Sequence, residues 1–576
     1  MMENKGNIRG NLRKSQIILG AGPGSIIDLK KGSVILSGIS KWENYDKDKD
    51  ILHSPKLERL LGVKYFVTPP HKKSIRFEDG TEIQQRDILA YQFPKWGYCP
   101  VCKKLGEIRD FIVASDGKWK CTCNNKTPII PSRFVIACEN GHIADFPYRY
   151  WVHGGSTNCK EEMKISETGT SAGLEAILIQ CNCGAHRNLD GIFDPKRFKY
   201  QCCGDKPWLG EDEKDVNCDK EVRVLQRSSS SVYYPVTASS IEVPQWNNRL
   251  TEELEKLKVL MNDDNKETFA KAIANSLNMP LEDVLDEMNK SIGWSGSMED
   301  EYRALRREYQ EDNFNSKEEK VPELLKEYVN RIVLINKMTE VIAQVGFKRI
   351  DPNYDVTNED TYVSFKKEQH DWLPAFENKG EGIFIEFNEE KIKEWELRKS
   401  VQDRYSKIIQ RADEGIFRSL RKTISPRTIL IHTLAHALIK ELTFECGYSA
   451  SSIKERIYTT YDEGIDMSGV LLYTTSSDAD GSLGGLVAQG KTEKIEIIFR
   501  RMLDRMEWCS TDPLCIEADL HGYKNANFAA CHACTLLPET SCELRNILLD
   551  RASIRGRLED LSIGFFGKFY ENEEIE

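Results

Sequence analysis

The sequence has little that would place it in a membrane or an exported compartment. No apolar stretch is long enough to cross a bilayer, and the residues from Met1 to Lys14 are polar and basic without an apolar signal core. An excess of positive charge is also missing. The formal net charge is −11, which argues against a protein coated in nucleic acid but leaves room for a local basic groove. We therefore expect a cytoplasmic chain without membrane contact.

Motifs of two enzyme classes are also missing. His432 and His436 are four residues apart, but Thr-Leu-Ala lies between them, so they do not form the HExxH motif of zinc proteases. No thioredoxin-like βαβ pattern surrounds the CxxC pairs, which argues against redox catalysis. We interpret the two histidines as core or interface residues that share one face of a helix.

Size and composition favour several metal-stabilised domains. The chain has 576 residues, too many for one hydrophobic core, and 40% of them are hydrophobic and 30% charged. It has 17 cysteines, many of them in CxxC and CxC pairs. In a reducing compartment such pairs indicate zinc rather than disulfides.

The first cysteine group has the spacing of a zinc ribbon. Cys99 and Cys102 form one pair, Cys121 and Cys123 form another, and a predicted strand over 107–114 separates them. Thiolates at such spacings reach one tetrahedral ion. We predict a structural zinc bound by these four cysteines.

The second cysteine group is less regular. We predict a zinc site among Cys181, Cys183, Cys203 and Cys218. Whether Cys202 or Cys203 is the ligand stays open at this point. Three further residues, Cys138, His142 and Cys159, either contribute a Cys–His pair or belong to a buried packing motif.

The third group follows a predicted helix (428–443), strand (469–474) and helix (492–508). Cys531 and Cys534 form a CxxC pair, and Cys542 lies close behind. Either Cys509 or Cys515 can supply the fourth sulfur. We predict a third zinc site among these five cysteines.

A glycine-containing run, 478–486, lies between the last two predicted elements. Glycines let backbone amides approach a phosphate or another chain. We interpret the run as a tight strand-to-helix turn rather than a Walker A loop, on the expectation that no Lys-Ser/Thr pair follows it at the required spacing, and we expect no ATPase activity. An alternative enzyme hypothesis is a metal-dependent nuclease that uses Asp478, Asp480 and a histidine.

Outside the cysteine groups, the sequence predicts a turn, a helical region and a basic cluster. Apolar residues flank a turn at Gly22-Pro23-Gly24. Helical spacing over 250–348, including 321–342, predicts a charged helical region. The densest basic cluster could contact phosphates, although we favour a helix end that balances acidic neighbours; the cluster consists of Arg418, Arg421, Lys422 and Arg427.

These observations predict a multidomain α+β protein. It has zinc-ribbon-like modules, a helical middle and an α/β C-terminal domain with a cysteine cluster. The predicted segments are an N-terminal α/β segment (1–95), a zinc-binding region (96–225), a helical region (226–350), a connecting α/β region (351–424), a C-terminal domain (425–555) and a tail (556–576).

Several motifs together resemble the DrmB family, a core component of the DISARM anti-phage defence system with a C-terminal domain shared with MrfA-like helicases. They are His-Thr-Leu-Ala-His at 432–436, Asp-Gly-Ser-Leu-Gly-Gly-Leu at 480–486, Asp-Pro-Leu-Cys at 512–515, Cys-His-Ala-Cys at 531–534, Glu-Thr-Ser-Cys-Glu from 539 on to Arg551, and the segment 16–28. The resemblance covers nearly the whole length.

The resemblance implies a non-catalytic subunit that forms a heterodimer with the DISARM helicase DrmA. Together the two would engage invading DNA that is single-stranded or carries a single-stranded overhang. Other DISARM components, including a DNA methyltransferase that marks host DNA, would act in the same system. Zinc is the implied cofactor.

Overall fold

The computed structural model describes most of the chain. The described residues are 10–42, 45, 49–70, 74–76, 82–84, 88–114, 118–123, 127–167, 169, 173–210, 213–244, 253–254, 257, 265–277, 281, 284–285, 288, 298–352, 354–356, 358–366, 370–414, 417, 420, 423–459, 461–462, 465–476, 484–567 and 569.

Two compact units divide the chain. Unit 1 contains residues 1–239 and 342–376, and unit 2 contains 240–341 and 377–576. Each unit therefore combines two separate stretches of sequence. The predicted α+β, multidomain class is confirmed, because helices and sheets are mixed and the C-terminal region contains a cysteine cluster. The six predicted segment boundaries remain predictions.

Unit 1 is built from short strands. A six-stranded sheet has the order β12-β8-β9-β15-β16-β17, and two three-stranded sheets have the orders β1-β2-β7 and β14-β13-β18. The elements are α1 (Lys14–Leu19), β1 (Ile26–Leu29), β2 (Gly32–Leu36), β3 (Ile51–Leu52), α2 (Pro55–Leu61), β4 (Tyr65–Val67), β5 (Ser74–Arg76), β6 (Glu82–Gln84), β7 (Ala90–Gln92), β8 (Trp96–Tyr98), β9 (Lys104–Glu107), β10 (Ile112–Val113), β11 (Trp119–Lys120), β12 (Ile130–Pro131), β13 (Phe134–Ala137), β14 (Ile143–Asp145), α3 (Tyr148–His153), β15 (Met163–Glu167), β16 (Ile177–Cys181), β17 (His186–Asn188) and β18 (Arg223–Gln226).

Unit 2 is organised around a longer antiparallel sheet. The strands follow the order β20-β21-β22-β23-β27-β24. The elements are α5 (Lys266–Leu277), α7 (Met298–Leu305), β20 (Tyr309–Gln310), β21 (Asn315–Glu319), α8 (Glu389–Glu396), α9 (Lys399–Ile409), α10 (Pro426–Cys446), β24 (Ile453–Tyr458), β25 (Tyr461–Asp462), β26 (Ile465–Asp466), β27 (Gly469–Ser476), α11 (Thr492–Arg505) and α12 (Ala552–Arg555). Three strands have residues in both units: β19 (Tyr234–Glu242), β22 (Val329–Lys348) and β23 (Trp372–Phe387).

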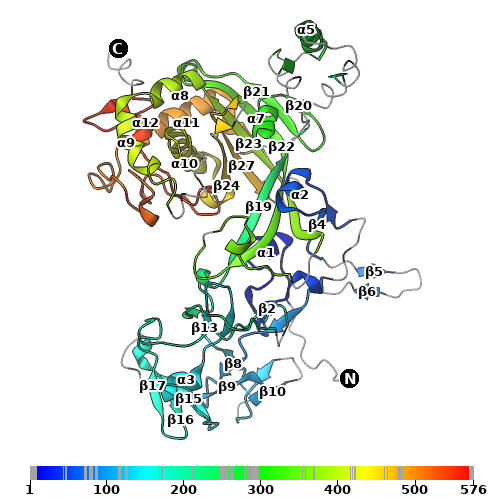
Figure 1. Cartoon of the computed structure of the whole chain (residues 1–576), viewed down its shortest axis with the longest axis vertical. Helices are drawn as coiled ribbons and strands as arrows, with labels where there is room; N and C mark the ends of the chain where they lie inside the picture. The colour runs from blue at the N-terminus through cyan, green and yellow to red at the C-terminus, as the bar shows by residue number, and fades with distance from the viewer. Residues whose placement is uncertain are drawn as a thin grey trace. The chain divides into compact units, whose positions relative to one another are not determined.

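Helix α10 is the centre of unit 2. Figure 1 shows it beside β24 and β27 with α8, α9 and α11 gathered around it, and it contacts all five elements. The Ser425 side chain accepts a hydrogen bond from the Thr428 N–H, Pro426 occupies the first turn, and Gly447 ends the helix with a φ of 68°. Sixteen of its 21 residues are buried, so this helix belongs to the core rather than to a surface.

The helix, strand and helix predicted over 425–508 are confirmed as α10, β27 and α11. The helix predicted over 321–342 is wrong, because residues 329–348 form the single strand β22. This strand is buried along most of its length. A strand that is covered on both faces is a continuous apolar run, which helical spacing also fits.

Candidate metal centres

The described residues form four Cys-rich tetrads whose ligand atoms could hold a metal ion. In each tetrad these atoms all lie within 4.8 Å of one another. The tetrads are tetrad 1 (Cys99, Cys102, Cys121, Cys123), tetrad 2 (Cys138, His142, Cys202, Cys218), tetrad 3 (His153, Cys159, Cys181, Cys183) and tetrad 4 (Cys509, Cys515, Cys531, Cys534).

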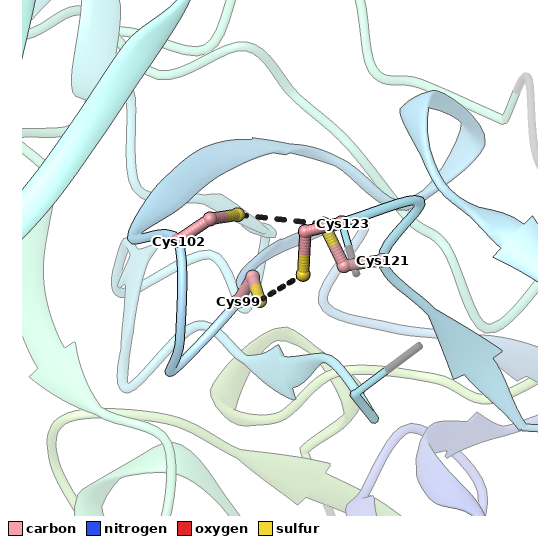
Figure 2. Close-up of side chains that lie close together, drawn as sticks. All are labelled: Cys99, Cys102, Cys121 and Cys123. Atoms are coloured by element: carbon pink, nitrogen blue, oxygen red, sulfur yellow. Dashed lines mark hydrogen bonds between the residues drawn. The ribbon is translucent and has the colours of Figure 1, made fainter. Parts of the chain in front are cut away.

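Tetrad 1 brings together the four cysteines expected from the sequence. Figure 2 shows the four side chains converging, with Cys99 Sγ 3.8 Å from Cys123 Sγ and Cys102 Sγ 3.5 Å from Cys121 Sγ. The first pair lies in the turn between β8 and β9, and Cys121 directly follows β11. Burial raises the pKa of the Cys99 thiol, but the backbone N–H groups of Cys102 and Val101 outweigh it and lower the pKa to about 7. Amides directed at a sulfur in this way favour the thiolate that a metal binds.

Tetrad 2 contains a histidine that is held by a carboxylate. His142 Nδ1 lies 3.4 Å from Cys138 Sγ and 3.5 Å from Cys202 Sγ, and its Nε2 lies 2.8 Å from Asp215 Oδ2. Nε2–H therefore donates to the carboxylate, and the Nδ1 lone pair faces the sulfurs. The carboxylate behind a ligating histidine is a frequent feature of metal sites, because it fixes the tautomer and the ring orientation.

Tetrad 3 has the same Cys₃His donor set and is closer to the surface. His153 Nδ1–H donates to the Arg149 carbonyl at 2.8 Å, so Nε2 faces Cys183 Sγ at 3.3 Å. Cys159 Sγ and Cys181 Sγ are 3.6 Å apart. The hydrogen bond from the Ala185 backbone N–H is the largest cause that lowers the pKa of the exposed Cys183 thiol to about 6.

Tetrad 4 lies at the end of α11. Cys509 Sγ is 3.4 Å from Cys531 Sγ, and Cys515 Sγ is 3.6 Å from Cys534 Sγ. Asp512 fixes the loop between the first two cysteines, because its carboxylate accepts the Cys509 N–H at 2.7 Å. The Arg551 guanidinium binds both oxygens of that carboxylate, at 2.6 and 2.7 Å. The Asp-Pro-Leu-Cys motif is thus joined to Arg551, which directly precedes α12.

The comparisons with known proteins agree with these positions. A family model described as "MrfA Zn-binding domain" matches residues 434–535, which include tetrad 4. A second model, "Domain of unknown function (DUF8724)", matches residues 13–234, which include tetrads 1 to 3. The sequence is 32% identical, over 584 aligned positions, to "DISARM protein DrmB" of Bacillus paralicheniformis (strain ATCC 9945a / NCIMB 11709 / CD-2), and the alignment covers 94% of this chain and 99% of that protein. The chain belongs to the DrmB family.

A solved structure, the DUF1998 helicase MrfA bound to DNA, is also similar to part of this DrmB family member. The identity is 9%, the TM-score is 0.16, and the match covers 36% of this chain and 22% of the helicase chain. A likeness of this size supports no argument about this chain.

Two predicted ligand sets need correction. The set Cys181, Cys183, Cys203 and Cys218 is wrong, because its members divide between tetrads 2 and 3 and Cys203 is an exposed residue outside both. The two tetrads instead include Cys138, His142, Cys159 and Cys202, which the sequence left open, and His153, which it did not indicate. The Cys138-x₃-His142 spacing was the signal that could have found tetrad 2. Cys542 is outside tetrad 4 and lies 3.1 Å from His432 Nε2 instead.

The glycine-containing run has a second correction. Residues 485–492 read Gly-Leu-Val-Ala-Gln-Gly-Lys-Thr, so a Lys-Thr pair does follow at Walker A spacing. In the structure, the first amides of this stretch and that of the preceding Gly484 face another anion. The N–H groups of Gly484, Leu486 and Val487 donate to the buried Glu381 carboxylate at 2.7, 2.9 and 3.3 Å. The Thr492 hydroxyl donates to the Glu319 carboxylate at 2.5 Å. The described part of the run is therefore a turn around the Glu381 carboxylate.

For Arg427 in the basic cluster, phosphate contact is wrong, and the favoured interpretation of a helix end that balances acidic neighbours agrees with the structure. Arg427 is fully buried and bonds to Glu389 and Glu396, each at 2.8 Å, so it cannot reach a phosphate. Arg418, Arg421 and Lys422 lie outside the described residues, as do Asp478 and Asp480. Among the residues that the structure describes, no helix is both long and apolar enough to span a bilayer.

Proposed function

We propose that this DrmB family member is a non-catalytic, zinc-stabilised subunit of the DISARM anti-phage system. It forms a heterodimer with a DrmA-like helicase, and the pair engages invading DNA. The observation that carries the proposal is the 32% identity to a DISARM DrmB protein along 94% of the chain. The geometry of the four tetrads supports it.

Each of tetrads 1 to 4 is proposed to bind one zinc ion. The donor sets fit: two sites are Cys₃His and two are Cys₄, and both sets are common in structural zinc sites. The histidine orientations fit as well, since each ring nitrogen that faces away from the sulfurs is held by a carboxylate or a carbonyl. Bound zinc supplies a cross-link between loops that are too short to pack a core of their own.

The same geometry supports the non-catalytic role. Structural zinc sites are closed by four protein ligands, whereas catalytic sites keep one position open for water or substrate. Each tetrad supplies four ligands. In the stretch with Walker A spacing, the amides of Leu486 and Val487 donate to Glu381 and that of Thr492 donates to Glu319.

DNA engagement is proposed for the heterodimer rather than for the chain alone. Phosphate contacts supply most non-specific affinity for DNA, and this chain has a net charge of −11. The proposed contact residues are Arg418, Arg421 and Lys422. The proposed ligand is single-stranded DNA or DNA with a single-stranded overhang, in a cytoplasmic system that also contains a DNA methyltransferase.

Co-expression with a DrmA-like helicase tests the proposal. We expect one-to-one co-elution in size exclusion and tighter binding of overhang DNA by the pair than by either subunit. A double variant, Trp508→Ala with Leu514→Ala, probes the partner surface, because these side chains are 70% and 78% exposed next to two cysteines of tetrad 4. Leu558→Ala, at a residue that is 92% exposed, is the matched control. Large apolar side chains left on a surface often mark interfaces.

Two outcomes would contradict the proposal. If the subunits elute apart at micromolar concentration, the heterodimer is excluded. If the purified chain alone cuts DNA when magnesium or manganese is added, the alternative of a metal-dependent nuclease replaces the non-catalytic role.

A further inference from the structure

A fifth cluster of metal-binding side chains lies in the core of unit 2. His432, His436, Glu455 and Cys542 bring their ligand atoms within 4.8 Å of one another, and all four residues are buried. The histidines are on one face of α10, the glutamate is on β24, and the cysteine belongs to the segment that follows tetrad 4. We call these four residues the His–Glu–Cys cluster.

The two imidazoles present nitrogen atoms to the same point. His436 Nδ1–H donates to the Thr535 carbonyl at 2.8 Å, which leaves the Nε2 lone pair facing Glu455 Oε1 at 3.3 Å. His432 Nε2 lies 3.1 Å from Glu455 Oε1 and 3.1 Å from Cys542 Sγ. Two nitrogens, one oxygen and one sulfur therefore converge from three segments.

The surroundings favour an ion at that point. The Glu455 side chain is 0% exposed, and its Oε2 has no hydrogen-bond partner among the described residues. The Asn546 N–H donates to Cys542 Sγ at 3.0 Å, a bond that favours a thiolate. A buried carboxylate without full compensation is costly, and neighbouring thiol and imidazole groups compensate it incompletely.

We propose that the His–Glu–Cys cluster binds a divalent transition-metal ion, zinc by its donor set, as a fifth and structural metal site. Two neutral imidazoles, one carboxylate and one thiolate together with a divalent cation sum to zero charge, which suits a site closed to water. The donors are those that zinc takes in tetrahedral sites. Four protein ligands leave no open position, so the site is not catalytic.

The ion would fasten the segment after Cys534 to the central helix. Thr535, whose carbonyl orients His436, directly follows Cys534 of tetrad 4. The two sites would thus hold both ends of the 535–542 segment, one at tetrad 4 and one at α10 and β24. The proposal does not require that tetrads 1 to 4 are occupied.

Anomalous diffraction from crystals of the full-length protein, purified without added metal, tests the site directly. Data collected above and below the zinc absorption edge should give a peak between His432 Nε2, His436 Nε2, Glu455 and Cys542 Sγ, and an X-ray fluorescence spectrum names the metal. Peaks at tetrads 1 to 4 with none at the cluster would overturn the inference. Because each site is observed separately, that result is distinct from a failure of the zinc proposal for the tetrads.

Metal analysis of variants gives a second test in solution. We expect Cys542→Ala to contain one zinc fewer per chain than the wild-type protein. Cys446→Ala is the matched control, since Cys446 is the last residue of α10 and belongs to none of the five clusters. The zinc content of this variant should be unchanged. A folded Cys542→Ala protein with the wild-type zinc content would overturn the inference. If that variant does not fold, the diffraction experiment on the wild-type protein decides.

Discussion

The buried Glu381 carboxylate gives the sharpest test of the tertiary structure. It lies on β23 and accepts hydrogen bonds from the backbone N–H groups of Gly484, Leu486 and Val487. Two glycines allow the backbone to adopt this turn. Gly484 has a φ of 122°, and a Cβ at Gly485 would approach the Tyr448 hydroxyl to 2.6 Å. We predict that Glu381→Gln loosens this turn.

The expected magnitude follows from the number of charged hydrogen bonds. A hydrogen bond to a charged group contributes about 1.5–3 kcal/mol. Glutamine keeps one carbonyl oxygen but replaces the other acceptor with an NH₂ donor that faces backbone N–H groups. We therefore expect a loss of about 2–4 kcal/mol in the free energy of local opening, since at least one such bond is replaced by a donor–donor contact. This corresponds to roughly 30- to 700-fold faster amide exchange.

Hydrogen–deuterium exchange of the peptide that contains residues 484–487 is the assay. It reports local opening, which a global unfolding curve of a two-unit protein does not resolve. Glu390→Gln is the matched control, because Glu390 is an exposed carboxylate on α8. Unchanged exchange at these amides in the Glu381→Gln protein would refute the reasoning, since the carboxylate would then not hold the turn.

Four further predictions use other parts of the structure. Arg427→Met should destabilise the protein by about 3–5 kcal/mol, because it leaves two glutamates without their buried partner; a lowered Tm in calorimetry checks this, and a normal Tm with lost DNA affinity would contradict it. Lys491→Ala should leave the Tm unchanged and the ATP hydrolysis rate at background, because Lys491 is an exposed residue in a turn built around Glu381. Asp145 is half-buried, and partial loss of solvent raises its pKa to about 6, although two backbone N–H bonds oppose the shift. Because ionisation of Asp145 is less favourable in the folded state than in the unfolded state, its contribution to the free energy of unfolding should fall as the pH rises from 3.8 to about 6 and stay lost above that pH. The difference in the free energy of unfolding between the wild-type protein and Asp145→Asn should therefore change across that window only. A chelator at neutral pH, or acidification that protonates the thiolates, should release zinc and lower the Tm, as a colorimetric zinc indicator and a thermal scan would report.

Local spacing predicted the sites whose ligands are close in sequence. Cys99 and Cys102 share one turn and Cys121 and Cys123 are almost adjacent, so tetrad 1 could be assigned from spacing alone. The same reasoning placed Cys531 and Cys534 in one site, and it predicted α10 from its apolar spacing. The single strand predicted over 107–114 is wrong, because a 3-10 turn at Ile108–Asp110 separates β9 from β10.

Spacing failed where ligands come from distant segments. Tetrad 2 takes Cys138 and His142 from the region after β13 and joins them to Cys202 and Cys218, which no local pattern connects. Cys542 is eight residues from Cys534, yet it packs against His432 more than a hundred residues earlier in the chain. Arg427 looked like part of a basic surface only because its glutamate partners are more than thirty residues away.

The sequence by itself determined the composition of this protein's sites: the cysteine pairs that make zinc sites plausible, the apolar periodicity of α10, and the family to which the chain is similar. Only the tertiary structure decided which side chains meet. Metal ligation and buried charge pairing act over a few ångströms, whereas sequence separation bears no fixed relation to distance once strands such as β22 and β23 bring remote segments into one sheet. Burial likewise becomes defined only when the core closes, and it makes Arg427 a structural cation and Glu381 the anion that the glycine-containing turn surrounds.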